Sequence, residues 1–257
     1  MHFVDAHVHA DVRSFEDFHT LALIGAKAIL ITAHNRVDFS NKGSLTDHFN
    51  DLLGRQCARV AKNGIIPLVA LGIHPRGIPR QELAESLAEL PRYLAETKVV
   101  ALGEVGLDLG GEQEEQVLYE QLCIAQKMSL PCLLHLPPQR KSEMLEVMVR
   151  LIERAGLEHG LVLIDHLNRK VLPRAREEGF YLGLSAHPAK LSPIEVAEII
   201  KDYGAEKIVV SSDMGNSAAD VGSVPKVIAE LKLRSIPPES IEKAVYQNAL
   251  DFLKVKL

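Results

Sequence analysis

Residues 3–9 read Phe-Val-Asp-Ala-His-Val-His and form the first apolar run of the chain. Side chains two positions apart on a β-strand point to the same side, so His7 and His9 can converge on one point at the end of a strand. Two imidazoles placed in this way are typical of the beginning of a metal site. We therefore expect a strand over residues 3–8 whose C-terminal end carries two metal ligands.

Similar apolar runs recur along the whole chain, separated by amphipathic segments. The further runs, rich in Val, Ile and Leu, lie at 27–32, 65–72, 98–103, 131–135, 161–165, 180–185 and 207–212. Continuous apolar runs are typical of strands in a parallel sheet that helices cover. The amphipathic segments predict helices at 45–63, 80–96, 114–128, 141–156, 192–203 and 218–233. The pattern is an alternation of strand and helix from end to end.

This alternation predicts an α/β protein with a single domain over residues 1–257, folded as a (β/α)8 TIM barrel. An open doubly wound sheet is the alternative, but it would not bring the first and last strands together, as the ligand pattern below requires. A final amphipathic segment begins at Pro238. We expect it to close the outside of the barrel.

Four more strands end in a residue that can bind a metal ion, namely Glu104, His135, His166 and Asp213. In a closed barrel the C-terminal ends of the strands face one common mouth. Together with the two histidines of the first strand, these residues exceed what one tetrahedral ion needs. The sequence therefore predicts a centre of two divalent ions.

The expected distribution of ligands is His7, His9 and Asp213 on one ion, His135 and His166 on the other, and Glu104 as the bridge between them. Imidazole and carboxylate ligands suit Zn, Mn or Fe. Two such ions generate a hydroxide near neutral pH and stabilise the charge that develops on the attacked group, so the set predicts hydrolysis. Asp213 is also a candidate general base for the attacking water.

Composition excludes several classes of protein. A net charge of -5 argues against a globally basic nucleic-acid surface. The cysteines, Cys57, Cys123 and Cys132, are far apart and odd in number, which argues against a disulfide framework or a thiolate metal site. No apolar run approaches the roughly 20 residues of a membrane helix. We expect a cytoplasmic protein without membrane contact, and the sequence carries no signature of its oligomeric state.

Four motifs in the chain resemble the TatD-type metal-dependent hydrolases of the amidohydrolase superfamily. They are Asp-Ala-His-Val-His-Ala-Asp at 5–11, Gly-Ile-His-Pro at 72–75, Gly-Glu-Val-Gly-Leu-Asp at 103–108 and Asn-Ala-Leu-Asp-Phe at 248–252. The strand-end residues His135, His166 and Asp213 match as well, so the resemblance spans nearly the whole chain. It implies a TIM barrel, the six ligands named above and two divalent metals. In the best-known members it implies Mg- or Mn-dependent deoxyribonuclease activity.

The resemblance also implies roles outside the metal ligands. His74 matches a histidine that contacts the substrate phosphate, and Asp108 would orient a ligand or the Glu104 loop. The chain departs from the family pattern after His135, where Leu-Pro-Pro follows, and after His166, where Leu-Asn-Arg follows. The metal ligands are retained while the residues around the substrate differ.

Cationic side chains follow several of these strands in the expected strand-to-helix loops. Arg76, Arg140 and Arg169 lie there, with Lys141 and Lys170 beside the last two. Cations at helix N-termini oppose the helix dipole, so helix stability does not explain their position, whereas a substrate phosphate would. Ordinary solvated loop charge is the alternative explanation.

The leading hypothesis from the sequence is a divalent-metal-dependent phosphoesterase or deoxyribonuclease that acts on a small phosphoester or a nucleic-acid end. A second hypothesis is an amide or lactone hydrolase or a deaminase of the same superfamily. A third is a metal-binding scaffold without turnover. His34 and His187 follow apolar runs and are expected to line the mouth without binding metal, whereas His48 is expected to be a surface or packing residue.

Overall fold

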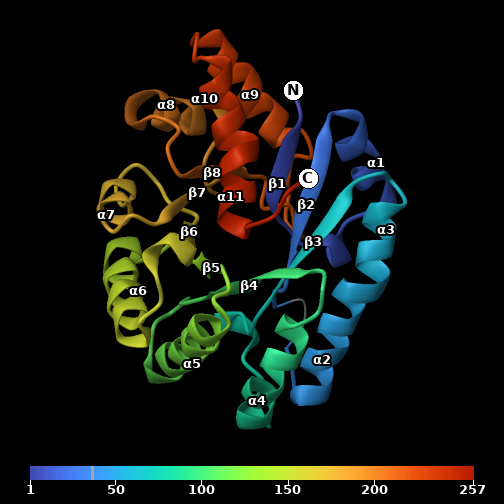
Figure 1. The fold of residues 1–257 in the computed structure, drawn as a ribbon, viewed down its shortest axis with the longest axis vertical. Coiled ribbons are helices and arrows are strands. Elements are labelled where there is room, and N and C mark those ends of the chain that lie inside the picture. Colours follow the sequence, from blue (N-terminus) through green and yellow to red (C-terminus); the bar gives the residue numbers. More distant parts are fainter. Residues whose placement is uncertain (36–37) are drawn as a thin grey trace.

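Eight parallel strands form a single sheet in the order in which they occur along the chain. We describe this fold in a computed structural model, which covers residues 1–35 and 38–257. The strands are β1 (Phe3–Val8), β2 (Ala26–Thr32), β3 (Ile66–Leu71), β4 (Val99–Gly106), β5 (Cys132–His135), β6 (Val162–Asp165), β7 (Tyr181–Ser185) and β8 (Ile208–Ser211). A parallel bridge between Val8 and Met214 joins the last strand to the first. The sheet is therefore a nearly closed barrel, as predicted (Figure 1).

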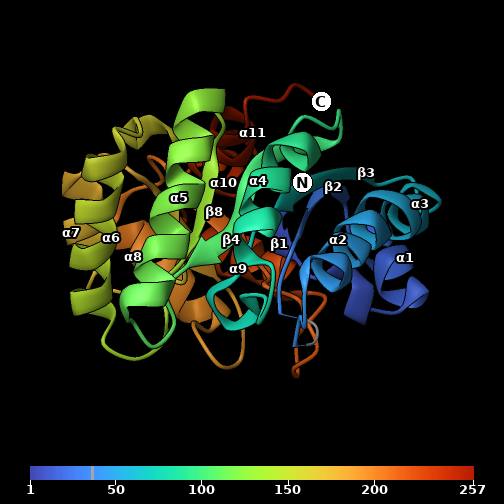
Figure 2. The same cartoon turned by 90° about the horizontal axis from the view of Figure 1, so that it is seen from below.

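Helices cover the outside of the barrel and one of its ends (Figures 1 and 2). They are α1 (Phe15–Leu23), α2 (Lys42–Asp51), α3 (Cys57–Ala61), α4 (Leu83–Leu94), α5 (Glu112–Met128), α6 (Lys141–Ala155), α7 (Leu172–Glu177), α8 (Pro193–Tyr203), α9 (Ser223–Leu233), α10 (Pro238–Glu242) and α11 (Asn248–Leu253). A π-helical turn over Leu52–Gln56 connects α2 and α3, so the helix expected at 45–63 is irregular and begins earlier.

Helices α1 and α7 were not expected from the sequence. Each buries only two side chains, Phe18 and Leu21 in α1 and Leu172 and Ala175 in α7, which is too few to give a clear amphipathic pattern. Helix α1 begins at a capping box in which Ser14 accepts a hydrogen bond from the backbone N–H of Asp17. Local capping, and not hydrophobic periodicity, marks the start of this helix.

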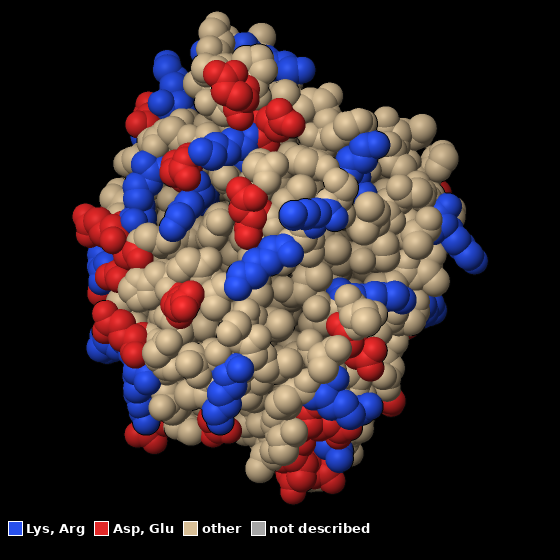
Figure 3. Space-filling model, in the orientation of Figure 1, with Lys and Arg blue, Asp and Glu red and all other residues tan. Residues whose placement is uncertain are grey.

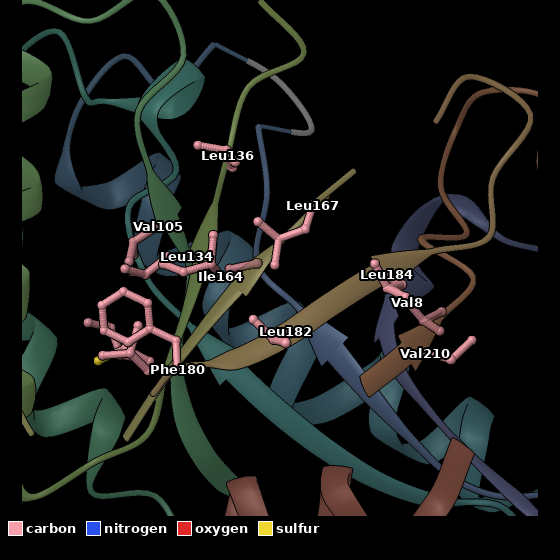
Figure 4. Packing of buried hydrophobic residues seen from close by; sticks show 14 of the residues in the cluster. Val8, Val105, Leu134, Leu136, Ile164, Leu167, Phe180, Leu182, Leu184 and Val210 are labelled. Atoms are coloured by element: carbon pink, nitrogen blue, oxygen red, sulfur yellow. The ribbon is translucent and has the colours of Figure 1, made fainter. Parts of the chain in front are cut away.

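Two apolar layers hold the barrel together. The outer layer lies between strands and helices and includes Leu134, Ile164 and Leu182, which Figure 4 shows on neighbouring strands. The inner layer contains the alternate strand residues, among them Ala28 and Leu30 of β2. This division follows from the two-residue period of a strand, which turns successive side chains to opposite faces. All of these strands are therefore covered on both sides, as their continuous apolar runs indicate.

The last helix does not lie where the sequence analysis expected it. Ala249, Leu250, Phe252 and Leu253 of α11 belong to the inner layer, together with residues that face the inside of the barrel. Helix α11 therefore closes one end of the barrel, and its expected place on the outside is wrong. Figure 1 shows α11 across the ring of strands. The amphipathic pattern could not distinguish these two positions, because either one buries a single apolar face.

The closing helix is fixed to the sheet by the first residue of the Asn-Ala-Leu-Asp-Phe motif. The buried side-chain amide of Asn248 donates to the carbonyl oxygens of Ala205 and Ile208, at 2.8 and 2.7 Å. Ile208 is the first residue of β8, and Ala205 lies shortly before this strand. This motif therefore has a structural role at the end of the barrel that α11 closes.

On the face drawn in Figure 3, lysine and arginine side chains alternate with acidic ones, and neither sign forms a large patch. Figure 3 shares the orientation of Figure 1, in which α11 is in front. Among the described helices, none has the length and apolar character needed to span a lipid bilayer.

Candidate metal centre

A pocket of about 540 Å³ opens where the C-terminal ends of the strands meet. The predicted ligands His9, Glu104, His135, His166 and Asp213 line it, as do the predicted substrate residues His74 and Arg76. The sixth predicted ligand, His7, is completely buried and lies 3.3 Å from Glu104, measured from Nε2 to Oε2. The barrel therefore brings together in one place all six residues that the sequence predicts as ligands.

Glu104 lies at the centre of this group. Although the predicted strand ends before it, β4 continues to Gly106, so the carboxylate projects from within a strand. Its oxygens face five histidine nitrogens: Oε1 is 2.6 Å from His135 Nδ1 and 3.0 Å from His166 Nε2, while Oε2 is 3.3 Å from His7 Nε2, 3.7 Å from His74 Nε2 and 3.9 Å from His9 Nε2. The two oxygens of this one carboxylate therefore face different sets of histidine nitrogens.

The carboxylates of the centre are held in their charged form. Burial alone would raise the pKa of Glu104, but the nearby His7 and His135 outweigh burial and hold this pKa well below its usual range. The pKa of Asp213 is likewise well below its usual range, because His7 and Lys190 outweigh the effect of burial. Two buried, ionised carboxylates among histidines form an environment that favours a cation.

The donor atoms form three overlapping groups, each compact enough for an ion: His7, His9 and Glu104; His7, His166 and Asp213; and His74, Glu104 and His135. They differ from the expected distribution in three ways. His7 is shared by two groups, His166 joins His7 and Asp213 and not His135, and His74 joins Glu104 and His135. The buried Nε2 atoms of His7 and His135 have no hydrogen-bond partner among the described residues. Unpartnered nitrogens beside ionised carboxylates fit a divalent ion with imidazole and carboxylate ligands, such as Zn or Mn.

Asp165 orients two of these histidines, and the sequence analysis gave it no role. Its Oδ2 atom is 2.6 Å from His7 Nδ1, and its Oδ1 atom accepts a hydrogen bond from the Ser185 hydroxyl at 3.0 Å. Because Ser185 donates to Asp165, it accepts from Nδ1 of His166, 2.8 Å away. Both rings turn Nε2 toward Glu104. The one available signal was an aspartate directly before a strand-end histidine.

Gly106, in the Gly-Glu-Val-Gly-Leu-Asp motif, allows β4 to approach β5 beside His135. Its φ angle is +154°, which L-residues rarely adopt. A Cβ atom at this position would lie 2.3 Å from the carbonyl oxygen of His135 and 2.9 Å from its nitrogen. The motif thus combines the central carboxylate with the glycine that leaves room for the next strand's histidine.

His166 and Asp213 share an unusual backbone conformation. His166 directly follows β6, and Asp213 lies shortly after β8. Their φ angles are +59° and +50°, respectively. The left-handed region is costly for residues other than glycine, and such residues cluster at functional sites. This conformation bends the chain at the mouth of the barrel, where both side chains reach the pocket.

His74 is held by the loop that carries the Gly-Ile-His-Pro motif. The buried side chain of Gln121 binds Ile73 on both sides, accepting from its N–H at 2.7 Å and donating to its carbonyl oxygen at 3.1 Å. Nδ1 of His74 accepts a hydrogen bond from the backbone N–H of Arg76 at 3.1 Å. Its proton is therefore on Nε2, and burial lowers the pKa of His74 well below its usual value. His74 is therefore a neutral hydrogen-bond donor, and its Nε2 atom faces Glu104.

The predicted basic residues do not share one location. Arg76 lines the pocket and pairs with Asp108 at 2.7 Å, so Asp108 orients this arginine. Arg140 and Arg169 are not among the described residues that line the pocket, and they pair with Glu143 and Asp202 on the outside.

Two lysines supply the other cations of the pocket wall. Lys141 donates to the carbonyl oxygen of His166 at 2.6 Å, and burial lowers its pKa to about 8. Lys190, which the sequence analysis did not single out, reaches the carboxylate of Asp213. Charge in a loop gives no indication of which way the side chain turns, so sequence alone could not separate these lysines from Arg140 and Arg169.

The remaining histidines near the mouth lie largely where the sequence suggested. His34 and His187 line the pocket. Nε2 of His34 is 2.9 Å from Oδ1 of Asp11, and its ring lies 4.2 Å from the ring of His9 between centroids. His48 is buried behind them, so of its two expected places packing is the one observed. His34 therefore supports one side of His9.

The chain is similar to known metal-dependent hydrolases over nearly all of its length. The family model described as TatD related DNase matches residues 4–254. An uncharacterized metal-dependent hydrolase of Methanocaldococcus jannaschii is 35% identical over 253 residues, which cover 98% of this chain and 100% of the relative. A human deoxyribonuclease is 23% identical over 281 residues, covering 96% of this chain and 93% of the relative.

A solved structure shows the same fold along the whole chain. The TatD-like protein of Archaeoglobus fulgidus superposes with a TM-score of 0.83 at 28% sequence identity, covering 98% of this chain and 100% of the other. The family model and the archaeal relative each extend over nearly all of the sequence. The chain therefore belongs to the TatD family and is a metal-dependent hydrolase.

Proposed function

We propose that this protein hydrolyses phosphodiesters, with two divalent ions, Zn, Mn or Mg, held at the mouth of the barrel. The observation that carries the proposal is the position of Glu104, whose two oxygens face histidines on opposite sides. A carboxylate whose oxygens belong to two neighbouring groups of potential metal ligands is suited to bridge two ions. His7, His9, His135, His166 and Asp213 are the remaining proposed ligands.

Residues of the chain would handle the proton of the attacking water beside the ions. When bound, a pair of ions supplies a Lewis acid and lowers the pKa of a coordinated water. Asp213 is the proposed acceptor of the proton from the attacking water, since its carboxylate is ionised and reaches the pocket. In the reaction the water oxygen bonds to phosphorus, the ester P–O bond breaks, and the alcohol leaves with a proton.

The pocket wall supports a phosphate as the group that is attacked. Arg76, Lys141 and Lys190 place three cationic side chains around the carboxylates. Charge-assisted hydrogen bonds from such groups to phosphate oxygens are short and strong. His74, with its proton fixed on Nε2, adds a neutral donor beside Glu104. A family relative that is a deoxyribonuclease also favours a nucleic-acid end as the substrate.

The decisive experiment measures hydrolysis of single-stranded DNA, RNA and a chromogenic phosphodiester by the purified chain with Mg, Mn or Zn, and again after chelation. We expect cleavage that requires metal and is lost in Glu104→Gln, with metal content below two ions per chain. Glu112→Gln, at the exposed start of α5, is the matched control and should behave like the unchanged protein.

Other results would point to the other hypotheses. Cleavage of an amide or lactone, or deamination, together with intact phosphodiesters, would replace the proposed substrate. Full metal binding without turnover on any of these substrates would favour a scaffold. The cytoplasmic location stays a prediction from the sequence.

A further inference from the structure

The ammonium group of Lys190 lies among the proposed metal ligands. It forms an ion pair with Oδ2 of Asp213, and it is 3.0 and 3.1 Å from the two ring nitrogens of His166. Lys190 belongs to the loop between β7 and α8, where its backbone N–H donates to the carbonyl oxygen of His187 at 2.8 Å. A turn of the chain therefore directs this lysine back into the mouth of the barrel.

The three donor groups of the centre are not equivalent with respect to this lysine. Lys190 contacts Asp213 and His166, which are two of the three members of the group completed by His7. Among the described contacts, it reaches no member of the group formed by His7, His9 and Glu104. A cation that binds at Asp213 and His166 must therefore take the place of another cation that belongs to the protein.

We propose that Lys190 competes with one of the two metal ions for Asp213 and His166. One ion then binds tightly beside Glu104, while the second binds more weakly because it has to displace the ammonium group. The displaced lysine remains at the pocket wall, where a substrate phosphate can accept its hydrogen bond. This inference rests on the proposed two-ion centre.

Lys141 provides a matched comparison within the same pocket. Its ammonium group donates to the carbonyl oxygens of Leu136 and His166, at 3.3 and 2.6 Å, and no contact to a ligand side chain is described for it. Removing either lysine takes one positive charge from the pocket wall. Only the removal of Lys190 also frees the side chains of Asp213 and His166. The two substitutions therefore separate direct competition from a general effect of charge.

The test is a calorimetric titration of Mn²⁺ into the metal-stripped full-length protein, into Lys190→Met and into Lys141→Met. We expect Lys190→Met to bind the second equivalent at least tenfold more tightly and the first within threefold of the unchanged protein. Lys141→Met should change neither value by more than threefold. Lys190→Arg, which keeps the charge, should resemble the unchanged protein and shows whether the loop tolerates substitution.

Each other outcome has a definite meaning. Two equivalents that bind with unchanged affinity in Lys190→Met contradict the competition and leave the two-ion centre standing. Equal tightening in Lys141→Met shows a bulk charge effect and also contradicts it. A single equivalent in every protein contradicts the two-ion centre itself. With saturating Mn²⁺, KM for a chromogenic phosphodiester should rise in Lys190→Met, and an unchanged KM would exclude the contact with substrate.

Discussion

His7 and Asp165 are joined by a short contact, 2.6 Å from Nδ1 to Oδ2, between the first and sixth strands of the barrel. This contact fixes the orientation of the His7 ring, so that Nε2 faces Glu104. Through Ser185 the same carboxylate also fixes the ring of His166. Residues that orient metal-binding histidines in this way change metal affinity when they are replaced.

We therefore expect Asp165→Asn to weaken metal binding by about 10–100-fold, because the amide is neutral and can present a donor to Nδ1. Metal affinity measured by competition with a chelator checks this. Asp202→Asn is the control, since Asp202 is half-exposed and pairs with Arg169 away from the pocket. Unchanged metal affinity in Asp165→Asn would show that the ring orientations do not depend on this carboxylate.

The close approach of β4 and β5 predicts a second effect. Gly106→Ala would bring a methyl group to 2.3 Å from the carbonyl oxygen of His135, so one of the two strands has to move. We expect a loss of about 1–3 kcal/mol in the free energy of unfolding, typical of overpacking, together with weaker metal binding. Gly111→Ala is the control, because its φ of 166° is ordinary extended backbone and no atom lies within 4 Å of the added carbon. Urea denaturation that gives equal stabilities for both variants would contradict the proposed clash.

The sequence predicts well the strands and the residues that meet at the mouth of the barrel, for a physical reason. A buried parallel strand is a short continuous apolar run, and the residue at its end has to face the mouth of the barrel. His135 ends β5, Glu104 lies near the end of the neighbouring β4, and the two are found together. The closed barrel then brings Asp213 of the last segment to His7 of the first, with Oδ1 3.5 Å from Nε2.

The loops are less predictable because a side chain there is not constrained by a repeating pattern. Arg140 turns outward to Glu143, whereas its neighbour Lys141 turns into the pocket. Lys190 enters the centre from a loop that carries no recognisable motif. The position of helix α11 is also ambiguous from the sequence, since its apolar face fits the end of the barrel as well as its outside. Tertiary contacts decide these cases, and a local stretch of sequence does not show which distant residue a side chain will contact.

Asn248 links the closing helix to β8, and this predicts a purely structural effect. Asn248→Ala removes two hydrogen bonds; the carbonyl group of Ala205 keeps the backbone N–H of Ile208 as a donor, whereas the carbonyl group of Ile208 loses the Asn248 amide. A buried acceptor left without a partner costs about 1–3 kcal/mol, so the midpoint of urea unfolding should fall. Metal affinity should stay unchanged, because the substitution lies at the opposite end of the barrel. Gln247→Ala, whose amide pairs with exposed Asp251, is the matched control.

The composition of the pocket wall predicts that the base of a nucleotide contributes little to binding. None of the described residues that line the pocket is Phe, Tyr or Trp. Stacking of a base on an aromatic side chain contributes about 1–3 kcal/mol, and 1.4 kcal/mol corresponds to a factor of about ten in binding. Arg76 and Lys141 instead offer contacts to phosphate.

We therefore expect a dinucleotide and its analogue with an abasic terminal sugar to have values of kcat/KM within about threefold of each other, because neither gains stacking energy. Steady-state kinetics on this matched pair, with the chromogenic diester as a reference, measures the effect. A preference of tenfold or more for the dinucleotide would reveal a contact to the base and contradict recognition through the sugar and phosphate. Equal rates for the pair, combined with a strong dependence on the charge of Arg76, would show that the phosphate carries the binding energy.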